Sequence, residues 1–279
     1  MSLSLQTNIT SLTAQNNLAT NTTNLDSAIT QLTSGYRINK SGDDAAGLAV
    51  ANGFRSDITE LQQGVRNAND AGAILQTVDG GLNNISNILD QLQSLATQSA
   101  SGTFSGNRTT LNNQFQTLLG EINRQASNIG LASGGGAASQ YNTSISVYIG
   151  GGDTQTDSQV NINLSGAANQ VDSAGLGIST SKIDTAQNAQ AAITSITAAV
   201  QSLGVTQGSV GDGENNLTYA IGLANSQITN KSAAEGNIRD ADIANAAAAL
   251  TRGQILQQSS VAALAQANSE PQALLKLLQ

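Results

Sequence analysis

Residues 51–96, with the sequence ANGFRSDITELQQGVRNANDAGAILQTVDGGLNNISNILDQLQSLA, decide the fold class. Apolar residues recur here at alternating intervals of three and four, the spacing that places side chains on one face of a helix. They are Ala51, Phe54, Ile58, Leu61, Val65, Ala68, Gly72 and Leu75, then Val78, Leu82, Ile85, Leu89, Leu92 and Ala96. The phase slips once, next to Gly80 and Gly81, which fits either a bend or an irregularity in the packing. A helix of this length extends about 70 Å.

Two further helical patterns follow. The shorter one places Leu111, Phe115, Leu118, Ile122 and Ile129 on one face. The longer one keeps the alternation of three and four over Ala186, Ala189, Ile193, Ile196, Val200, Leu203, Gln207, Val210, Glu214, Leu217, Ile221, Ala224 and Ile228. Polar residues interrupt this stripe at two positions that lie among four glycines, and each interior glycine costs about 1 kcal/mol relative to alanine. We therefore expect residues 207–214 to be the least stable part of the third helix.

A different pattern between the second and third helices predicts β-structure. Apolar and polar residues alternate over residues 145–149 and again over residues 160–164, and a glycine-rich stretch at residues 150–157 joins them. This is the pattern of a β-hairpin with an exposed loop. The predicted fold class is mainly α, a long antiparallel helical rod or coiled coil with a small β-hairpin region.

The two ends of the chain carry apolar stripes with little charge, and no charged residue occurs from Met1 to Asn24. A long helix with an uncovered apolar face is not stable alone in water, so we expect both ends to mediate self-assembly. The alternative is that the ends only pair with each other within one chain. The candidate self-assembly residues are Leu5, Ile9, Leu12, Leu18, Leu25, Ile29, Leu32, Leu250, Val261, Leu264, Leu274, Leu275 and Leu278.

The composition argues against several classes of function. The net charge is −8 and only 11% of residues are charged, so no basic patch can bind nucleic acid. The absence of His and Cys removes most nucleophile–base pairs and most transition-metal sites. The acid pairs Asp43–Asp44 and Asp240–Asp242 fit a structural role better than acid–base catalysis, and Asp43–Asp44 stands where acids favour a helix N-terminus. We expect no catalytic residue, cofactor or metal. We also expect no membrane insertion, because no apolar run reaches roughly 18 residues.

Segments near the two ends carry the most specific signals. They are LTSGYRIN at 32–39, DDAAGLAVA at 43–51, RNAND at 66–70, IRDAD at 238–242, LTRGQILQQ at 250–258 and LAQAN at 264–268. In this order they resemble bacterial flagellin, the subunit of the flagellar filament. The resemblance implies an inner coiled-coil domain formed by the first and last helices and a rod domain formed by the adjoining helices and the hairpin.

The resemblance assigns residues 1–40 and 236–279 to the inner domain. It assigns residues 41–130 and 181–235 to the helices of the rod domain and residues 131–180 to its hairpin region. Since residues 130–181 are expected to hold just the hairpin, the chain looks like a minimal flagellin with only the two core domains.

The resemblance also implies partners and a location. Flagellins form a helical homopolymer outside the cell after passing unfolded through the flagellar type III export apparatus. This agrees with the start of the chain, which lacks the basic segment and apolar core of a cleaved signal peptide. An export chaperone covers the C-terminal helix in the family, and the candidate contacts here are Ile255, Leu256, Val261 and Leu264. Filament cap and hook-associated proteins are further expected partners.

Many flagellins bind Toll-like receptor 5 through a rod motif of the form QRxRELA. This chain has DQLQSLA at residues 90–96, so Gln91 and Gln93 replace the two Arg residues and Ser94 replaces the Glu. Leu95 and, on the next helix, Glu121 are kept. Because Gln lacks the charge and bidentate geometry of Arg, we expect weak or no receptor activation. The alternative is that these positions are ordinary solvated surface.

Two other functions compete with the filament subunit. One is a hook–filament junction or adaptor protein, which shares terminal helices with flagellins but has weaker signatures. The other is an enzyme carried on a flagellin scaffold, of which the known type has a His-Glu-x-x-His metalloprotease motif. This chain has no His. The sequence therefore favours the structural subunit.

Overall fold

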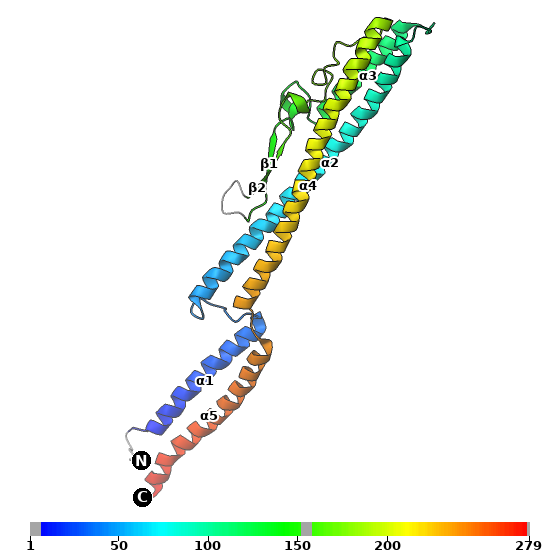
Figure 1. Ribbon diagram of the computed structural model, residues 1–279. Helices are drawn as coiled ribbons and strands as arrows, with labels where there is room; N and C mark the ends of the chain where they lie inside the picture. Colours follow the sequence, from blue (N-terminus) through cyan, green and yellow to red (C-terminus); the bar gives the residue numbers. More distant parts are fainter. Residues whose placement is uncertain (1–6, 152–157, 278–279) are drawn as a thin grey trace. The chain divides into compact units, whose positions relative to one another are not determined.

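The computed structural model describes residues 7–151 and 158–277, with side chains described as far as residue 269. This part of the chain forms five α-helices and one β-hairpin; Figure 1 shows where each lies along the chain. The elements are α1 (Ile9–Ser34), α2 (Ala45–Ala100), α3 (Arg108–Asn128), β1 (Ser144–Tyr148), β2 (Gln159–Asn163), α4 (Ala186–Arg239) and α5 (Ile243–Leu277), with short 3-10 helices at Gly136–Ser139 and Ala167–Asn169. The predicted fold class is confirmed.

The chain forms two compact units. Met1–Ser56 and Asn230–Gln279 make one, here called the terminal unit, and Asp57–Thr229 make the other, the central unit. Both α2 and α4 run without a break through the residues where the units divide. The domain boundaries expected after residues 40, 130, 180 and 235 therefore stay a prediction.

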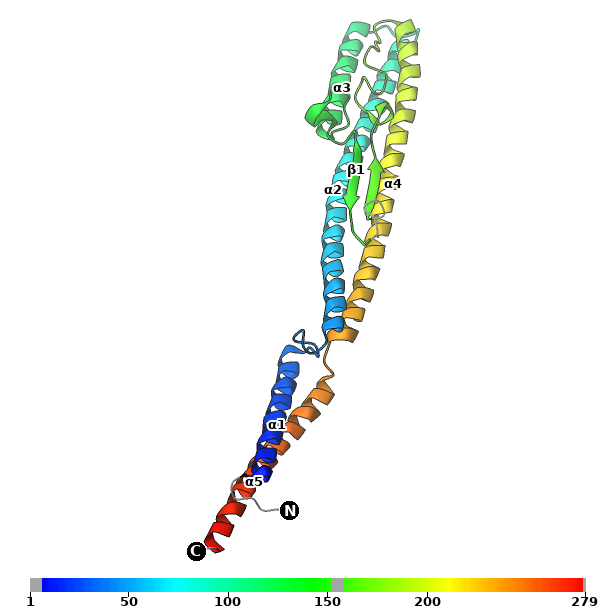
Figure 2. The same cartoon turned by 90° about the vertical axis from the view of Figure 1, so that its left-hand side faces the viewer.

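In the central unit, α2 and α4 run side by side in opposite directions, and α3 packs beside them at one end (Figures 1 and 2). The predicted apolar stripe of α2 forms much of the core. From Leu75 to Ala96 every predicted core position of α2 is at most 1% exposed. Since the core is a line of aliphatic side chains between helices, it needs few aromatic residues, and Phe115 on α3 is the one large ring among the fully buried side chains described.

The phase slip in α2 does not break the helix. Gly80 is exposed, but a Cβ added at Gly81 would lie only 2.2 Å from Cγ2 of Ile129. Ile129 follows the last residue of α3 rather than lying within the helix, and its side chain is buried against α2. The irregularity therefore marks a close approach between the end of α3 and α2.

The predicted stripe of α4 is half correct. The positions Ala189, Ile196, Leu203, Val210, Leu217 and Ala224 are buried as expected. The alternate positions are shifted by one residue, because Ala192, Ala199, Thr206 and Gly213 are buried in place of Ile193, Val200, Gln207 and Glu214. Small residues at these positions allow the backbone of α4 to lie close to its neighbours. A Cβ at Gly213, for example, would lie 2.7 Å from Ile162 Cγ2.

The polar residues Gln207 and Glu214 therefore lie beside the core and do not interrupt it. The prediction that residues 207–214 weaken the helix now rests only on the glycines. Of these, Gly208 and Gly211 have open space around them.

The predicted β-hairpin is confirmed, with antiparallel pairing of Ile145 with Ile162 and Val147 with Val160. Figure 2 shows it alongside α2 and α4. Gly64 of α2 allows the chain after β1 to approach, since a Cβ there would lie 1.8 Å from the carbonyl oxygen of Ile149. The expectation that the segment between the helical halves holds only the hairpin was wrong. Its buried residues outside the hairpin strands include Leu131, Leu164, Val171, Leu176 and Ile178, and they extend the core.

Candidate assembly surface

In the terminal unit, α1 and α5 pair in opposite directions through polar contacts. Asn8 caps α1 by accepting a hydrogen bond from the Ser11 backbone N–H at 3.0 Å, and its amide donates to the carbonyl of Ala267 at 2.8 Å. Further along the pair, the Asn21 amide donates to Ser260 Oγ at 3.0 Å. These side chains fix the register of the two helices.

The residues buried between α1 and α5 are mostly small. They are Ser11, Leu25, Ala28, Ala246, Gly253 and Ala267. A Cβ at Gly253 would lie 3.0 Å from Leu25 Cδ1, so the helices already touch at this point. A contact of this kind uses little of the apolar surface that the two helices carry.

Most of the larger aliphatic side chains point away from the helix pair. The exposed ones are Ile9, Leu12, Ile29, Ile243, Ile255, Leu256 and Val261, each between 42% and 66% exposed. Leu18, Leu32, Leu250 and Leu264 are half-buried. An isolated soluble protein normally does the reverse and buries its largest aliphatic residues. These exposed large residues mark α1 and α5 as surfaces for protein contacts.

Four of the predicted self-assembly residues cannot be placed. Leu5 and Leu278 lie outside the described residues. Leu274 and Leu275 belong to α5, but their side chains are outside the described part. Leu25 differs from the others because it is buried within the α1–α5 pair. The candidate export-chaperone contacts Ile255, Leu256 and Val261 are exposed, and Leu264 is half-buried.

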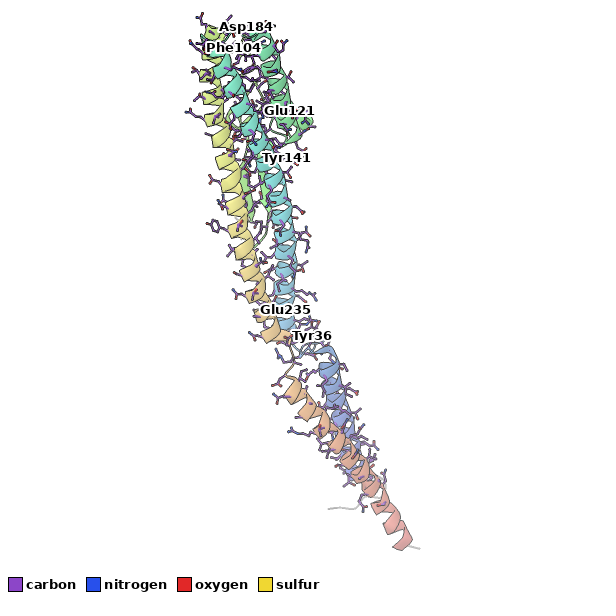
Figure 3. The ribbon with its side chains drawn as sticks, turned by 90° about the vertical axis from the view of Figure 1, so that its right-hand side faces the viewer. Tyr36, Phe104, Glu121, Tyr141, Asp184 and Glu235 are labelled. Carbon is purple, nitrogen blue, oxygen red and sulfur yellow. The ribbon has the colours of Figure 1, made fainter. Side chains whose placement is uncertain are left out.

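Two of the motif segments, one near each end of the sequence, contact each other in the structure. The backbone N–H of Arg37 donates to the carbonyl of Arg239 at 2.7 Å, and that of Ala241 donates to the carbonyl of Gly35 at 2.8 Å. The Arg239 guanidinium lies over the Tyr36 ring, 4.1 Å from its centroid. Figure 3 shows Tyr36 near the end of α4. The sequence analysis did not predict this contact, although Tyr36 and Arg239 both lie within the motifs that it identified.

Three acidic residues of these motifs accept hydrogen bonds from backbone N–H groups at turns and helix starts. The Asp44 carboxylate accepts a hydrogen bond from the Gly47 N–H at the start of α2, and Asp242 accepts one from the Asn245 N–H at the start of α5. Hydrogen bonds from the backbone N–H groups of Asn39 and Lys40 lower the pKa of Asp43. These contacts are those of carboxylates that stabilise turns and helix starts.

The receptor-motif residues lie on α2 and α3 of the central unit. Gln91 and Ser94 are exposed, and Gln93 and Leu95 are half-buried. Glu121 of α3 accepts a hydrogen bond from Arg124 Nε at 2.8 Å. Bonds from Arg124 and then from Gln125 lower the pKa of Glu121 to about 2. An open groove of about 490 Å³ runs between the two helices. Its lining residues are Gln91, Ser94, Leu95, Gln114, Thr117 and Leu118.

Comparison with known proteins identifies the family. Residues 5–130 match the bacterial flagellin N-terminal helical region, and residues 193–278 match the bacterial flagellin C-terminal helical region. The chain belongs to the bacterial flagellin family. It is 33% identical to a flagellin of Halalkalibacterium halodurans, over 98% of each chain, and 33% identical to a flagellin of Listeria monocytogenes, over 99% of each. It is 32% identical to the flagellar filament 30.7 kDa core protein of Treponema maltophilum, over 97% of this chain and 98% of that one.

A crystal structure of Bacillus cereus flagellin also matches, with 24% identity and a TM-score of 0.48, over 61% of this chain and 94% of that one. Flagellins are structural proteins, and the chain is a structural subunit of the bacterial flagellar filament. These matches do not favour the hook–filament junction alternative. Within the described residues, every helix is too short or too polar to cross a membrane.

Proposed function

We propose that copies of this chain polymerise through the outward apolar faces of α1 and α5, which form the inner part of the filament. The main observation in support is that these helices bury mostly small residues between themselves and expose seven large aliphatic ones. Burying an aliphatic side chain fully contributes about 1.5 to 3 kcal/mol, so seven that are roughly half exposed contribute about 5 to 10 kcal/mol.

This gain is comparable with the cost of immobilising one subunit, which is about 4 to 15 kcal/mol. A single pair of copies is therefore weakly held, and stable assembly requires each subunit to contact several others. Such cooperativity suits a filament that grows at its end and does not assemble from scattered dimers.

A charge placed on the outward face tests this proposal. Leu12 is 58% exposed, so Leu12→Asp should leave the fold of the monomer intact while burying an unpaired carboxylate in the polymer. We expect at least a tenfold rise in the critical concentration for polymerisation, measured by sedimentation and electron microscopy. Asn225→Asp, at an exposed polar position of α4, is the matched control and should polymerise normally. Equal polymerisation of both variants would refute the role of the α1 face.

We further propose that the chain is exported unfolded through the type III apparatus to the extracellular filament. The exposed pair Ile255 and Leu256 supports an export-chaperone contact on α5. Replacing both with Ser should weaken binding of the purified chaperone by at least tenfold, whereas Thr251→Ser at an exposed position should not. Filament cap and hook-associated proteins complete the proposed partners.

We also infer weak or no activation of Toll-like receptor 5. The exposed Gln91 offers neither the charge nor the fork of donors that Arg would. Gln91→Arg should raise potency in a receptor reporter assay, and full potency of the unchanged chain would contradict the inference.

Finally, we infer that the chain has no catalytic role. It has no His and no Cys, and Asp44 and Asp242 of its motifs are used as caps. The same composition, with its net charge of −8, does not support nucleic-acid binding.

A further inference from the structure

The outer face of α4 carries exposed apolar side chains that the α1–α5 surface does not explain. Val205, Tyr219 and Leu223 are 58%, 75% and 61% exposed. In the described part of the central unit, the other large apolar side chains with high exposure are Val200 on α4 and Tyr148 on β1. The outer surfaces of α2 and α3 in this unit contribute none, so the exposure is concentrated on one helix.

These three residues point in one direction. With 3.6 residues per turn, Leu223 lies five turns after Val205, and Tyr219 lies one turn before Leu223. They form a line of about 27 Å, which we call the Tyr219 stripe. Tyr is the kind of residue that dominates protein interfaces, because its ring buries a large area and its hydroxyl tolerates a wet rim.

The groove between α2 and α3 has the complementary form. Each helix contributes residues at positions i, i+3 and i+4, namely 91, 94 and 95 on α2 and 114, 117 and 118 on α3. Leu95 and Leu118 are half-buried, and the other four lining residues are uncharged polar ones. A hole of this pattern between two helices accepts side chains spaced i, i+4 on a third helix. Glu121, labelled in Figure 3, lies on α3 three residues after the groove residue Leu118.

We propose that in the filament the Tyr219 stripe of one copy docks into the α2–α3 groove of a second copy. This inference rests on the proposed polymerisation. A helical polymer requires a heterologous contact, in which two different surfaces of the same chain are complementary. The stripe and the groove are two such surfaces, and neither brings a charged residue to the contact between Tyr219, Leu223 and the groove. Asp212, two turns before Tyr219 on the same face, lies at the edge of the contact.

The position of the two surfaces rules out their meeting within one chain. Gln207 of α4 contacts Asn83 of α2, with 3.4 Å between the Gln207 amide nitrogen and the Asn83 oxygen, which sets these residues level. From that level the groove lies toward the C-terminal end of α2, and Tyr219 and Leu223 lie in the opposite direction. At 1.5 Å per residue, the separation along the helices is about 36 Å. Docked copies are therefore displaced along the helix direction, and the contact repeats from copy to copy.

Disulfide trapping tests the pairing directly, because the chain has no Cys of its own. One preparation carries Asn216→Cys, beside Tyr219 on the exposed face of α4, and the other carries Ser94→Cys or Thr117→Cys in the groove. All three are exposed positions. The preparations are mixed, polymerised, oxidised with copper phenanthroline and separated on a non-reducing gel. The matched control replaces the groove cysteine with Asn84→Cys, at an exposed position of α2 outside the groove.

We expect the groove variants to give at least tenfold more covalent dimer than the control, and only in polymerised samples. A second test uses charge. Tyr219→Lys should raise the critical concentration at least tenfold without changing the melting temperature of the monomer, and adding Thr117→Glu should reverse most of the rise. Filaments that form normally but give no more dimer than the control would overturn the inference and leave the proposed polymerisation standing. Failure of the unchanged chain to form filaments would overturn both.

Discussion

The adjacent glycines Gly80 and Gly81 of α2 provide a test of the packing. Replacing each with alanine should change the free energy of unfolding differently at the two positions. Gly80 is exposed with no atom within 4 Å of an added Cβ, whereas an added Cβ at Gly81 would lie 2.2 Å from Ile129 Cγ2. Replacing a glycine inside a helix with alanine stabilises it by about 1 kcal/mol where space allows. Gly80→Ala should therefore raise the free energy of unfolding by about 1 kcal/mol.

Gly81→Ala gains the same helix propensity but must displace Ile129. Its Cγ2 is attached directly to Cβ, and the side chain is 5% exposed, so it cannot move away without a rotamer change or a shift of the end of α3. Overpacking of this kind costs about 1 to 3 kcal/mol. Gly81→Ala should thus be about 1 to 3 kcal/mol less stable than Gly80→Ala.

Urea unfolding followed by circular dichroism measures this difference, and at about 2 to 4 °C per kcal/mol thermal unfolding also resolves it. A double-mutant cycle locates the cause. In an Ile129→Ala background the obstruction is gone, and Gly81→Ala should become as favourable as Gly80→Ala. If Gly81→Ala is as stable as Gly80→Ala in the unchanged background, the close approach of α3 to α2 is refuted.

Three further predictions concern the central unit. Ser99→Ala should cost about 1 to 3 kcal/mol in urea unfolding, because the fully buried hydroxyl donates to the Ile183 carbonyl and its loss leaves that oxygen unpaired. An unchanged midpoint would show that water replaces the hydroxyl. Glu121→Gln should lower the melting temperature at pH 7 but not at pH 2. The Glu121 pKa is lowered from 4.5 to about 2, so its stabilising effect is present above pH 4.5 and is lost as the pH falls through about 2. A difference that is independent of pH would contradict this. Gly208→Ala and Gly211→Ala, where a Cβ meets open space, should each stabilise the helix by about 1 kcal/mol and alter filament shape. Unchanged supercoiling in electron micrographs would count against a role of this stretch in shape.

The sequence predicted the core of α2 well because apolar residues, most of them large and aliphatic, repeat on one face. From Leu75 onward, large aliphatic residues fill the stripe, and they are the residues that are buried. The buried face of α4 was harder to predict. Ala192 and Gly213 are small and only weakly apolar, whereas their neighbours Ile193 and Glu214 and the exposed Val200 occupy the positions that the hydrophobic spacing selected. The choice between adjacent positions depends on how closely the neighbouring backbones lie, and this distance is not visible in hydrophobic spacing.

The candidate assembly surface shows the same limit. Exposed apolar faces at both ends were predicted, and Leu12 and Val261 lie on them. The sequence did not separate Leu25, which is buried in the α1–α5 pair, from its exposed neighbours. It also missed the contact between Tyr36 and Arg239, which joins residues about 200 positions apart through a turn at each end. Long-range pairing of short motifs needs the fold before it can be seen.

A helical reconstruction of filaments polymerised from the purified chain tests the central claim most directly. Leu12, Ile29, Ile255 and Val261 are exposed in the single chain, and we predict that each contacts a neighbouring copy and is buried in the filament. Side chains at these positions that still face solvent, in a filament held together by the central units alone, would contradict assembly through α1 and α5.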